Sequence, residues 1–317
     1  MTTLVTGIGL VGTAFAKVAL QRGERLVFFD FQPRGEFLRR KLGDAGVDVV
    51  KKDIRDLPAL VQAIKDFDVD TVVHTAGLIG GRVAESLYTG LQINVMGTIN
   101  VAEAVRVTGV KRLVHISTLS VYNRRLEGST PISEEFNRGD GFPYGNSKVA
   151  KELMLEAYQR LYGFELIVLR LANVYGLGHF WAGSAGGGKI QTLLEKGLRG
   201  ETARIPQEQT MSFEYIYSKD VGRAIDLAAT VPMPAKNVFN IGTGKVLTFE
   251  ELTNAARRVL PKLKVEIIPG KPPHLSVAQP MDCSRAKEYL SWEPQFTMEQ
   301  AFEDYTQELK RDGGVGH

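Results

Sequence analysis

The chain opens with the stretch TTLVTGIGLVG at residues 2–12, and an apolar-periodic run follows it as far as Leu20. The first five residues of the stretch predict a short buried strand, and the periodic run predicts a helix. Between them Gly7, Gly9 and Gly12 have the G-x-G-x-x-G spacing, which allows a tight turn, a close backbone approach to a ligand and close packing of helix on strand. The N–H groups at the start of such a helix face an anion. The stretch therefore predicts a dinucleotide-binding turn.

A second apolar run, RLVFF at 25–29, predicts the next strand, and Asp30 follows it. An acid about 20 residues beyond the glycines is placed to accept hydrogen bonds from an adenosine ribose. Its charge repels a 2′-phosphate, so the pattern favours NAD as the cofactor. Arg34 lies nearby and keeps NADP as an alternative. A packing turn that binds no ligand is the remaining alternative.

The composition is that of an ordinary folded protein. The chain has 317 residues, of which 44% are hydrophobic and 24% charged, with a net charge of +3. No basic stripe is present, so nucleic acid is not expected as a partner. The single cysteine, Cys283, excludes an internal disulfide and a cysteine metal cluster. The first strand begins at residue 2 and no apolar run is long enough to span a bilayer, so we expect a soluble cytoplasmic protein with no targeting segment.

Strand and helix patterns alternate along the first half of the chain. Strands are expected at 2–6, 25–29, 48–50, 71–75, 112–116 and 165–169, and helices at 13–20, within 31–45, and at 57–67, 84–108 and 144–162. Such alternation predicts a doubly wound parallel α/β sheet of the Rossmann kind with helices on both faces. Ligands bind beyond the carboxyl ends of such strands. The informative residues are therefore Gly7, Asp30, Asp53, Ala76, Thr118 and Asn173.

Tyr144 and Lys148 lie four residues apart in the predicted helix 144–162, so they share one helical face. For a tyrosine to act as a base near neutral pH, its pKa must fall by about 3 from about 10, which costs roughly 4 kcal/mol. The Lys148 ammonium and a positively charged nicotinamide ring both favour the phenolate. Tyr144 can then take the proton of a substrate hydroxyl while hydride leaves the carbon. The alternative is an ordinary exposed helix pair, because Y-x-x-x-K is common.

Thr118 supports the catalytic interpretation. It comes just after the predicted strand 112–116, where its hydroxyl can hydrogen-bond the reacting oxygen. Taken alone, Thr118 would be a strand-end or turn-capping hydroxyl.

These residues belong to a longer pattern. The chain resembles an extended short-chain dehydrogenase/reductase of the NAD-dependent epimerase/dehydratase type. The matching segments run in family order across nearly the whole chain: TGIGLVG at 6–12, Asp30, DI at 53–54, HTAG at 74–77, NVMGT at 94–98, STLSVY at 117–122, Tyr144 with Lys148, RLANVYG at 170–176, FNIGTG at 239–244 and WEP at 292–294.

The resemblance implies an NAD-dependent enzyme. The catalytic residues expected are Thr118, Tyr144 and Lys148. The cofactor contacts expected are Gly7, Gly9, Leu10, Val11, Gly12, Asp30, Asp53, Ile54, Thr75, Ala76, Gly77, Asn94, Tyr144 and Lys148. The substrate contacts expected are Thr118, Leu119, Tyr144, Asn173 and His179. No metal is expected. The helices near 84–108 and 144–162 are expected to pair in a homodimer.

Beyond Gly176 the sequence changes character. We expect residues 1–175 with about 212–243 to form the NAD-binding domain, and about 176–211 with 244–317 to form a smaller substrate-binding α/β region. Residues 178–188 are rich in glycine and predict either an active-site lid, with His179 as a substrate contact, or a plain surface connection. Further helices are expected at 189–199, 248–260 and 298–310, and residues 313–317 are expected to fray.

Four departures from the family pattern bear on the reaction. The glycine turn is one residue shorter than the usual T-G-x-x-G-x-x-G. Leu119-Ser120 follow Thr118 where family dehydratases carry Asp-Glu, so dehydration is not expected. TMS at 210–212 stands where nucleotide-sugar enzymes often place an arginine that clamps the diphosphate. Ile79 stands where sugar epimerases often have a lysine that holds NAD.

The last two departures favour an enzyme whose NAD exchanges. The main expectation is therefore an NAD-dependent oxidoreductase, a net dehydrogenase that acts on a secondary alcohol of a sugar, a sugar acid or a similar small polyol. The alternative is a nucleotide-sugar 4-epimerase with retained NAD, in which Arg204, Lys219 or Arg285 binds the phosphate. A non-catalytic NAD-sensing protein is the third alternative, although such relatives usually lose the active tyrosine or lysine.

Overall fold

The computed structural model of the chain describes residues 1–123, 130–178, 185–273 and 279–311. Its main element is a seven-stranded sheet in the order β10-β6-β5-β4-β1-β2-β3, and every neighbouring pair of strands is parallel. The strand order reverses beside β1, which is where doubly wound sheets bind dinucleotides. The strands are β1 (Thr2–Thr6), β2 (Arg25–Asp30), β3 (Asp48–Lys51), β4 (Thr71–His74), β5 (Arg112–Thr118), β6 (Glu165–Leu171) and β10 (Val238–Ile241).

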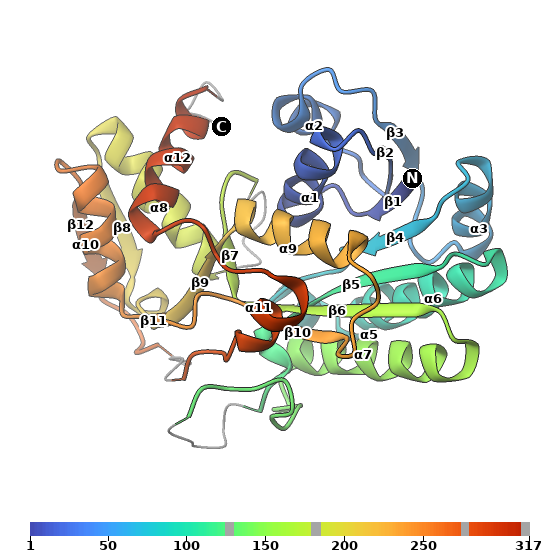
Figure 1. Cartoon of the computed structure of the whole chain (residues 1–317). Coiled ribbons are helices and arrows are strands. Elements are labelled where there is room, and N and C mark those ends of the chain that lie inside the picture. The colour runs from blue at the N-terminus through green and yellow to red at the C-terminus, as the bar shows by residue number, and fades with distance from the viewer. Residues whose placement is uncertain (124–129, 179–184, 274–278, 312–317) are drawn as a thin grey trace.

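Helices cover both faces of this sheet (Figure 1). On one face a buried cluster joins the sheet to α1 (Leu10–Gln21), α2 (Gly35–Leu42), α9 (Ser218–Thr230) and α11 (Ser284–Leu290). On the other face a second cluster joins it to α3 (Leu57–Asp66), α6 (Gly97–Thr108) and α7 (Pro143–Tyr162). The predicted fold class is confirmed: this is a doubly wound parallel α/β sheet.

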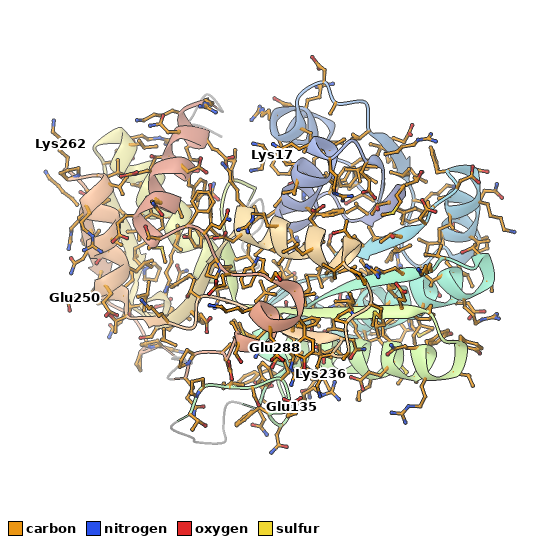
Figure 2. The ribbon with its side chains drawn as sticks, in the orientation of Figure 1. Lys17, Glu135, Lys236, Glu250, Lys262 and Glu288 are labelled. Atoms are coloured by element: carbon orange, nitrogen blue, oxygen red, sulfur yellow. The ribbon has the colours of Figure 1, made fainter. Side chains whose placement is uncertain are left out.

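The remaining elements form a smaller part with its own buried cluster, at the left of Figure 1. It holds a three-stranded sheet in the order β11-β9-β7 and the strand pair β12-β8. Its elements are β7 (Asn173–Tyr175), α8 (Ala185–Arg199), β8 (Thr202–Pro206), β9 (Phe213–Tyr217), β11 (Val246–Leu247), α10 (Phe249–Val259), β12 (Lys264–Ile268) and α12 (Met298–Arg311). Charged side chains point outward on both parts, as Lys17, Lys236 and Lys262 show in Figure 2.

Two predicted elements differ from those observed. The helix expected at 84–108 breaks at Ser86, whose backbone is extended, into α4 (Arg82–Glu85), α5 (Leu87–Leu91), a π-helical turn (Gln92–Met96) and α6. The break lets α5 fold against α4, and at Gly90 a Cβ would lie only 2.9 Å from the Val83 carbonyl oxygen.

The second difference is at the glycine-rich segment. Gly186 to Gly188 belong to α8 rather than to a loop. A Cβ on Gly186 would lie 3.2 Å from the Asn173 Oδ1, so α8 packs on β7 too closely for most side chains. His179 and the fraying predicted at 313–317 lie outside the described residues. No described helix is long and apolar enough to cross a bilayer.

Candidate active site

The glycine turn between β1 and α1 is shaped to receive an anion. Gly7 has a φ of +93°, and a Cβ on Gly12 would lie 2.5 Å from the Gly7 carbonyl oxygen, so side chains are excluded at both positions. Gly9 caps α1 with no side chain, and a Cβ at Gly9 would meet nothing within 4 Å. The start of α1 therefore leaves room beside Gly9, and the unpaired N–H groups of a first helical turn favour an anion such as a pyrophosphate there.

Asp30 lies beside this turn in a fixed orientation. One carboxylate oxygen accepts the Ile8 N–H at 2.6 Å, and the other accepts the Gln32 N–H at 2.7 Å. Each oxygen keeps a further lone pair for a ribose hydroxyl. Arg34 lies close by: burial lowers its pKa, and the Asp30 charge acts in the opposite direction.

The turn after β4 adjoins the glycine turn. Thr75 Oγ1 donates to the Thr6 carbonyl at 2.6 Å, and a Cβ on Gly7 would lie 3.3 Å from the Ala76 Cα. Asn94 is fully buried and holds the backbone of Leu78, two residues after Ala76. Its side chain accepts the Leu78 N–H at 2.7 Å and donates to the Leu78 carbonyl at 3.0 Å. The structure thus brings the expected cofactor residues of β1, β2 and β4 together.

Asp53 and Ile54 lie at the carboxyl end of β3. Arg55 engages both Asp53 oxygens, at 3.0 Å and 2.6 Å, and this hydrogen bonding lowers the pKa of the carboxyl group. Ile54 is buried against Gly97 of α6, where a Cβ would approach it to 2.7 Å. These two residues therefore line the edge of the sheet next to Asp30.

Thr118, Tyr144 and Lys148 converge at the carboxyl end of β5. Thr118 caps a 3₁₀ turn by accepting the Ser120 N–H at 3.2 Å, and it hydrogen-bonds the Tyr144 phenol. The Lys148 Nζ lies 5.9 Å from the centre of the Tyr144 ring and donates to the Ile116 carbonyl at 3.0 Å. Asn94 Nδ2 also reaches this helix, donating to Ser147 Oγ at 3.1 Å.

The phenolate expected for catalysis depends on the charge of bound NAD as well as on Lys148, and the protein alone provides only the lysine. Burial raises the pKa of Tyr144 to about 12, and the Thr118 hydrogen bond offsets only part of that rise. Burial lowers the pKa of Lys148 to about 8, against the charge of Glu152. The phenol of the protein alone is therefore protonated near neutral pH. The main cause is burial of the phenol, and the Lys148 Nζ donates to the Ile116 carbonyl rather than to the phenol oxygen.

A buried ionic network holds α7 against the sheet. Glu152 receives hydrogen bonds from Arg170 at 3.0 and 2.7 Å, from Ser117 Oγ at 2.5 Å and from Arg138 at 2.9 Å. Since removing one partner of a buried charge pair is strongly destabilising, this network fixes the orientation of the helix that carries Tyr144.

His74 is a structural residue that sequence analysis did not single out. Its ring nitrogens lie 2.7 Å from Thr6 Oγ1 and 2.9 Å from Thr98 Oγ1. Thr98 donates its own proton to the Asn94 carbonyl at 2.7 Å, which assigns the ring proton to Nε2. Burial holds the pKa of His74 well below its usual range, which favours the neutral ring. The ring connects Thr6, just before the glycine turn, to Thr98 of α6.

On the substrate side, Asn173 donates to the Glu214 carbonyl at 3.2 Å, and Leu119 is buried. The three cations suggested for a phosphate are each paired with acids. Arg204 contacts Glu266, Lys219 contacts Asp304 and Glu308, and Arg285 contacts Glu134 and Glu135.

Lys189 is the cation that sequence analysis missed. It is almost fully buried, and its Nζ donates to the carbonyls of Gln209 and Met211 at 2.8 and 2.9 Å. It also lies 5.0 Å from the centre of the Phe213 ring. Burial alone lowers its pKa to about 8, and no acid among the described residues opposes that shift. The lysine at the start of an amphipathic helix gave no signal of burial in the sequence.

The strand order, the glycine turn and Asp30 define a dinucleotide-binding α/β protein. A model of the NAD dependent epimerase/dehydratase family matches residues 3–242. The chain belongs to this family and is an NAD-dependent enzyme of the extended short-chain dehydrogenase/reductase type. The open turn, the bare Gly9 and the oriented Asp30 fit NAD.

Relatives and solved structures extend over almost the whole chain. A UDP-glucose 4-epimerase of Mycolicibacterium smegmatis is 31% identical, with 94% of this chain and 95% of the relative covered. A putative UDP-glucose 4-epimerase of Methanocaldococcus jannaschii is 29% identical, with 98% of both covered. The structure of a UDP-glucose 4-epimerase from Thermotoga maritima with UDP-glucose has a TM-score of 0.85 at 25% identity, covering 98% of this chain and 99% of the other. These similarities favour the epimerase alternative over the expected net dehydrogenase.

Proposed function

We propose that this chain is a nucleotide-sugar 4-epimerase that retains its NAD. The observation that carries the proposal is the convergence of Thr118, Tyr144 and Lys148 beside the NAD site, in a chain whose full-length relatives include named UDP-glucose 4-epimerases. Residues about 176–211 and 244–317 would hold the sugar nucleotide.

Tyr144 takes the proton of the sugar hydroxyl, and Thr118 holds the reacting oxygen in place. NAD, when bound, supplies the hydride acceptor and a positive ring that favours the phenolate. Lys148 adds a second positive charge on the same helical face. Once the 4-keto sugar has presented its other face, the hydride would return to that face of C4 and Tyr144 would give the proton back to the oxygen, so the hydroxyl is inverted with no net oxidation.

Dehydration does not fit this site. Leu119 is buried directly after Thr118, and no carboxylate stands at either of the two positions that follow Thr118. Elimination needs a general acid and a general base near the sugar in addition to Tyr144.

The substrate diphosphate needs a cation, and we assign that role to Lys189. Its Nζ contacts the Met211 carbonyl, which lies in the 210–212 stretch where family members often carry a clamping arginine. Lys189 is buried with no acid partner among the described residues, so an anionic substrate would complete its environment.

The proposal is tested with purified protein and a panel of UDP-sugars and free polyols, followed by absorbance for NADH and by sugar analysis. Interconversion of 4-epimers with no net NADH is the expected result, and Lys189→Met should raise KM for the UDP-sugar without changing NAD binding. Net NADH with a free polyol would overturn the epimerase proposal in favour of a dehydrogenase.

The enzyme is also proposed to be a homodimer. The helices α6 and α7 lie side by side on one outer face and leave apolar side chains exposed to solvent. The Arg106 guanidinium of α6 lies 5.0 Å from the centre of the Tyr162 ring of α7, so this face is continuous.

A further inference from the structure

A second buried lysine lies next to the cofactor site, and the reaction proposed above does not use it. Lys151 stands three residues beyond Lys148 on α7 and is 1% exposed. Its Nζ donates to the Ala76 carbonyl at 3.2 Å, and a Cβ on Gly77 would lie 3.4 Å from that Nζ. The amine therefore lies directly beside the turn that adjoins the glycine turn of β1.

Lys151 has no acid partner among the residues that the structure describes. The acid that follows it on α7, Glu152, already accepts hydrogen bonds from Arg170, Ser117 and Arg138. Both oxygens of the Glu152 carboxylate are therefore engaged by that network. A buried ammonium without an acid is unfavourable unless another anion is present.

The titratable groups that face Lys151 are cationic or neutral. They are Lys148 on the same helix, His74 on β4 and His115 on β5. Burial, followed by the charge of Lys148, holds the pKa of Lys151 well below its usual range. Burial likewise holds the pKa of both histidines well below their usual range, which favours their neutral form, and neither can supply the negative charge that Lys151 lacks.

We propose that Lys151 is a cofactor-retaining residue whose ammonium pairs with the pyrophosphate of NAD across the Ala76-Gly77 turn. The pyrophosphate is the anion that NAD brings to this turn, and Gly77 places no side chain in between. Lys151 thereby replaces the lysine that sugar epimerases often carry where this chain has Ile79. The inference rests on the proposed function only in that an epimerase must keep its NAD.

A proton accompanies this pairing. Burial and the charge of Lys148 lower the pKa of Lys151 in the free protein, and a pyrophosphate beside the amine should raise it, so NAD binding should favour proton uptake. The affinity for NAD then falls as pH rises between the pKa of Lys151 in the free protein and its higher pKa in the complex. Lys148 titrates nearby, with a pKa of about 8, so a variant of Lys151 is needed to assign the effect.

The test compares Lys151→Gln and Lys151→Met with the wild type by calorimetry with NAD alone, from about pH 6 to about pH 9, in two buffers of different ionisation enthalpy. Both variants should bind NAD about tenfold more weakly near neutral pH. Both should also take up fewer protons, and their affinity should depend less on pH. The Lys189→Met variant, which removes a lysine of equal burial from the substrate part, should bind NAD as the wild type does.

Lys151→Gln separates charge from structure. Glutamine keeps a donor for the Ala76 carbonyl but carries no charge, so wild-type NAD affinity in this variant would mean that Lys151 only fixes the turn, and the inference would fail. Replacing a buried unpaired lysine by methionine should leave the thermal midpoint of the NAD-free protein unchanged or higher. Because no sugar is used, a missing epimerase activity would refute the proposed function and leave this inference standing.

Discussion

At the scale of single residues, the proposed reaction depends on Tyr144 as the acid/base. Tyr144→Phe removes the phenol oxygen and keeps the ring, so turnover should fall by about 10²–10⁴-fold, the usual contribution of a positioned acid/base. NAD binding should stay within a few-fold of the wild type, because the backbone of the glycine turn is untouched. Steady-state assays and NAD titration of the same preparation check both statements. Near-native turnover would show that another group moves the proton.

We expect Asp30 to set the choice between NAD and NADP. Asp30→Asn keeps one side-chain oxygen for the Ile8 N–H but removes the charge that repels a 2′-phosphate. The charge of the neighbouring Arg34 favours a bound 2′-phosphate once the Asp30 charge is removed. NAD should bind more weakly and NADP more tightly, which fluorescence titrations with both cofactors would measure. An unchanged ratio of the two affinities would remove Asp30 from the selectivity.

At the scale of elements, two glycines of one turn have separable roles. Gly12→Ala places a Cβ 2.5 Å from the Gly7 carbonyl, so α1 must move from β1, and the protein should lose about 1–3 kcal/mol of unfolding free energy. In Gly9→Ala the new Cβ points into open space, and the φ of −116° at this position is unstrained. The free energy of unfolding without NAD should therefore not change. NAD affinity should fall in both variants. In Gly9→Ala the added methyl group would occupy the space proposed for the pyrophosphate, and in Gly12→Ala the turn that faces this space would be displaced.

Chemical denaturation without NAD and calorimetry with NAD distinguish the two glycine variants. Gly188→Ala is the matched control, since Gly188 lies in α8, where a Cβ would also meet nothing within 4 Å. Lower stability of Gly9→Ala would show that the space beside Gly9 is not open. Wild-type NAD affinity in this variant would show that the pyrophosphate does not bind there.

At the scale of the whole molecule, the sequence predicts the central sheet well because its signals are local. The run at 2–12 and each strand that follows it are read from neighbouring residues, and β1 to β6 appear where they were expected. The break at Ser86 could not be predicted, because it depends on the packing of α5 against α4. The burial of Lys151 and Lys189 was missed for the same reason: lysine is ordinarily exposed, and only the assembled fold encloses these two.

The outer face of α6 and α7 is the surface at which we expect two copies of the chain to pair. Met154 and Leu161 are seven residues apart on α7, which puts them on one helical face, and both are exposed. Single apolar side chains on a surface need no explanation, but Met96, Val107 and Tyr162 extend this patch across both helices. We therefore expect a second copy of the chain to cover these side chains in the proposed homodimer.

The double variant Met154→Glu with Leu161→Glu places four charges at the centre of a two-fold interface, since each copy contributes two. We expect the wild type to run as a dimer in light scattering after size exclusion and the variant to run as a monomer. Its thermal unfolding should become independent of protein concentration, because no dimer remains to dissociate. Ile267→Glu, on the exposed strand β12 of the smaller part, is the control and should remain dimeric. A monomeric wild type, or a dimeric double variant, would place the interface elsewhere or remove it.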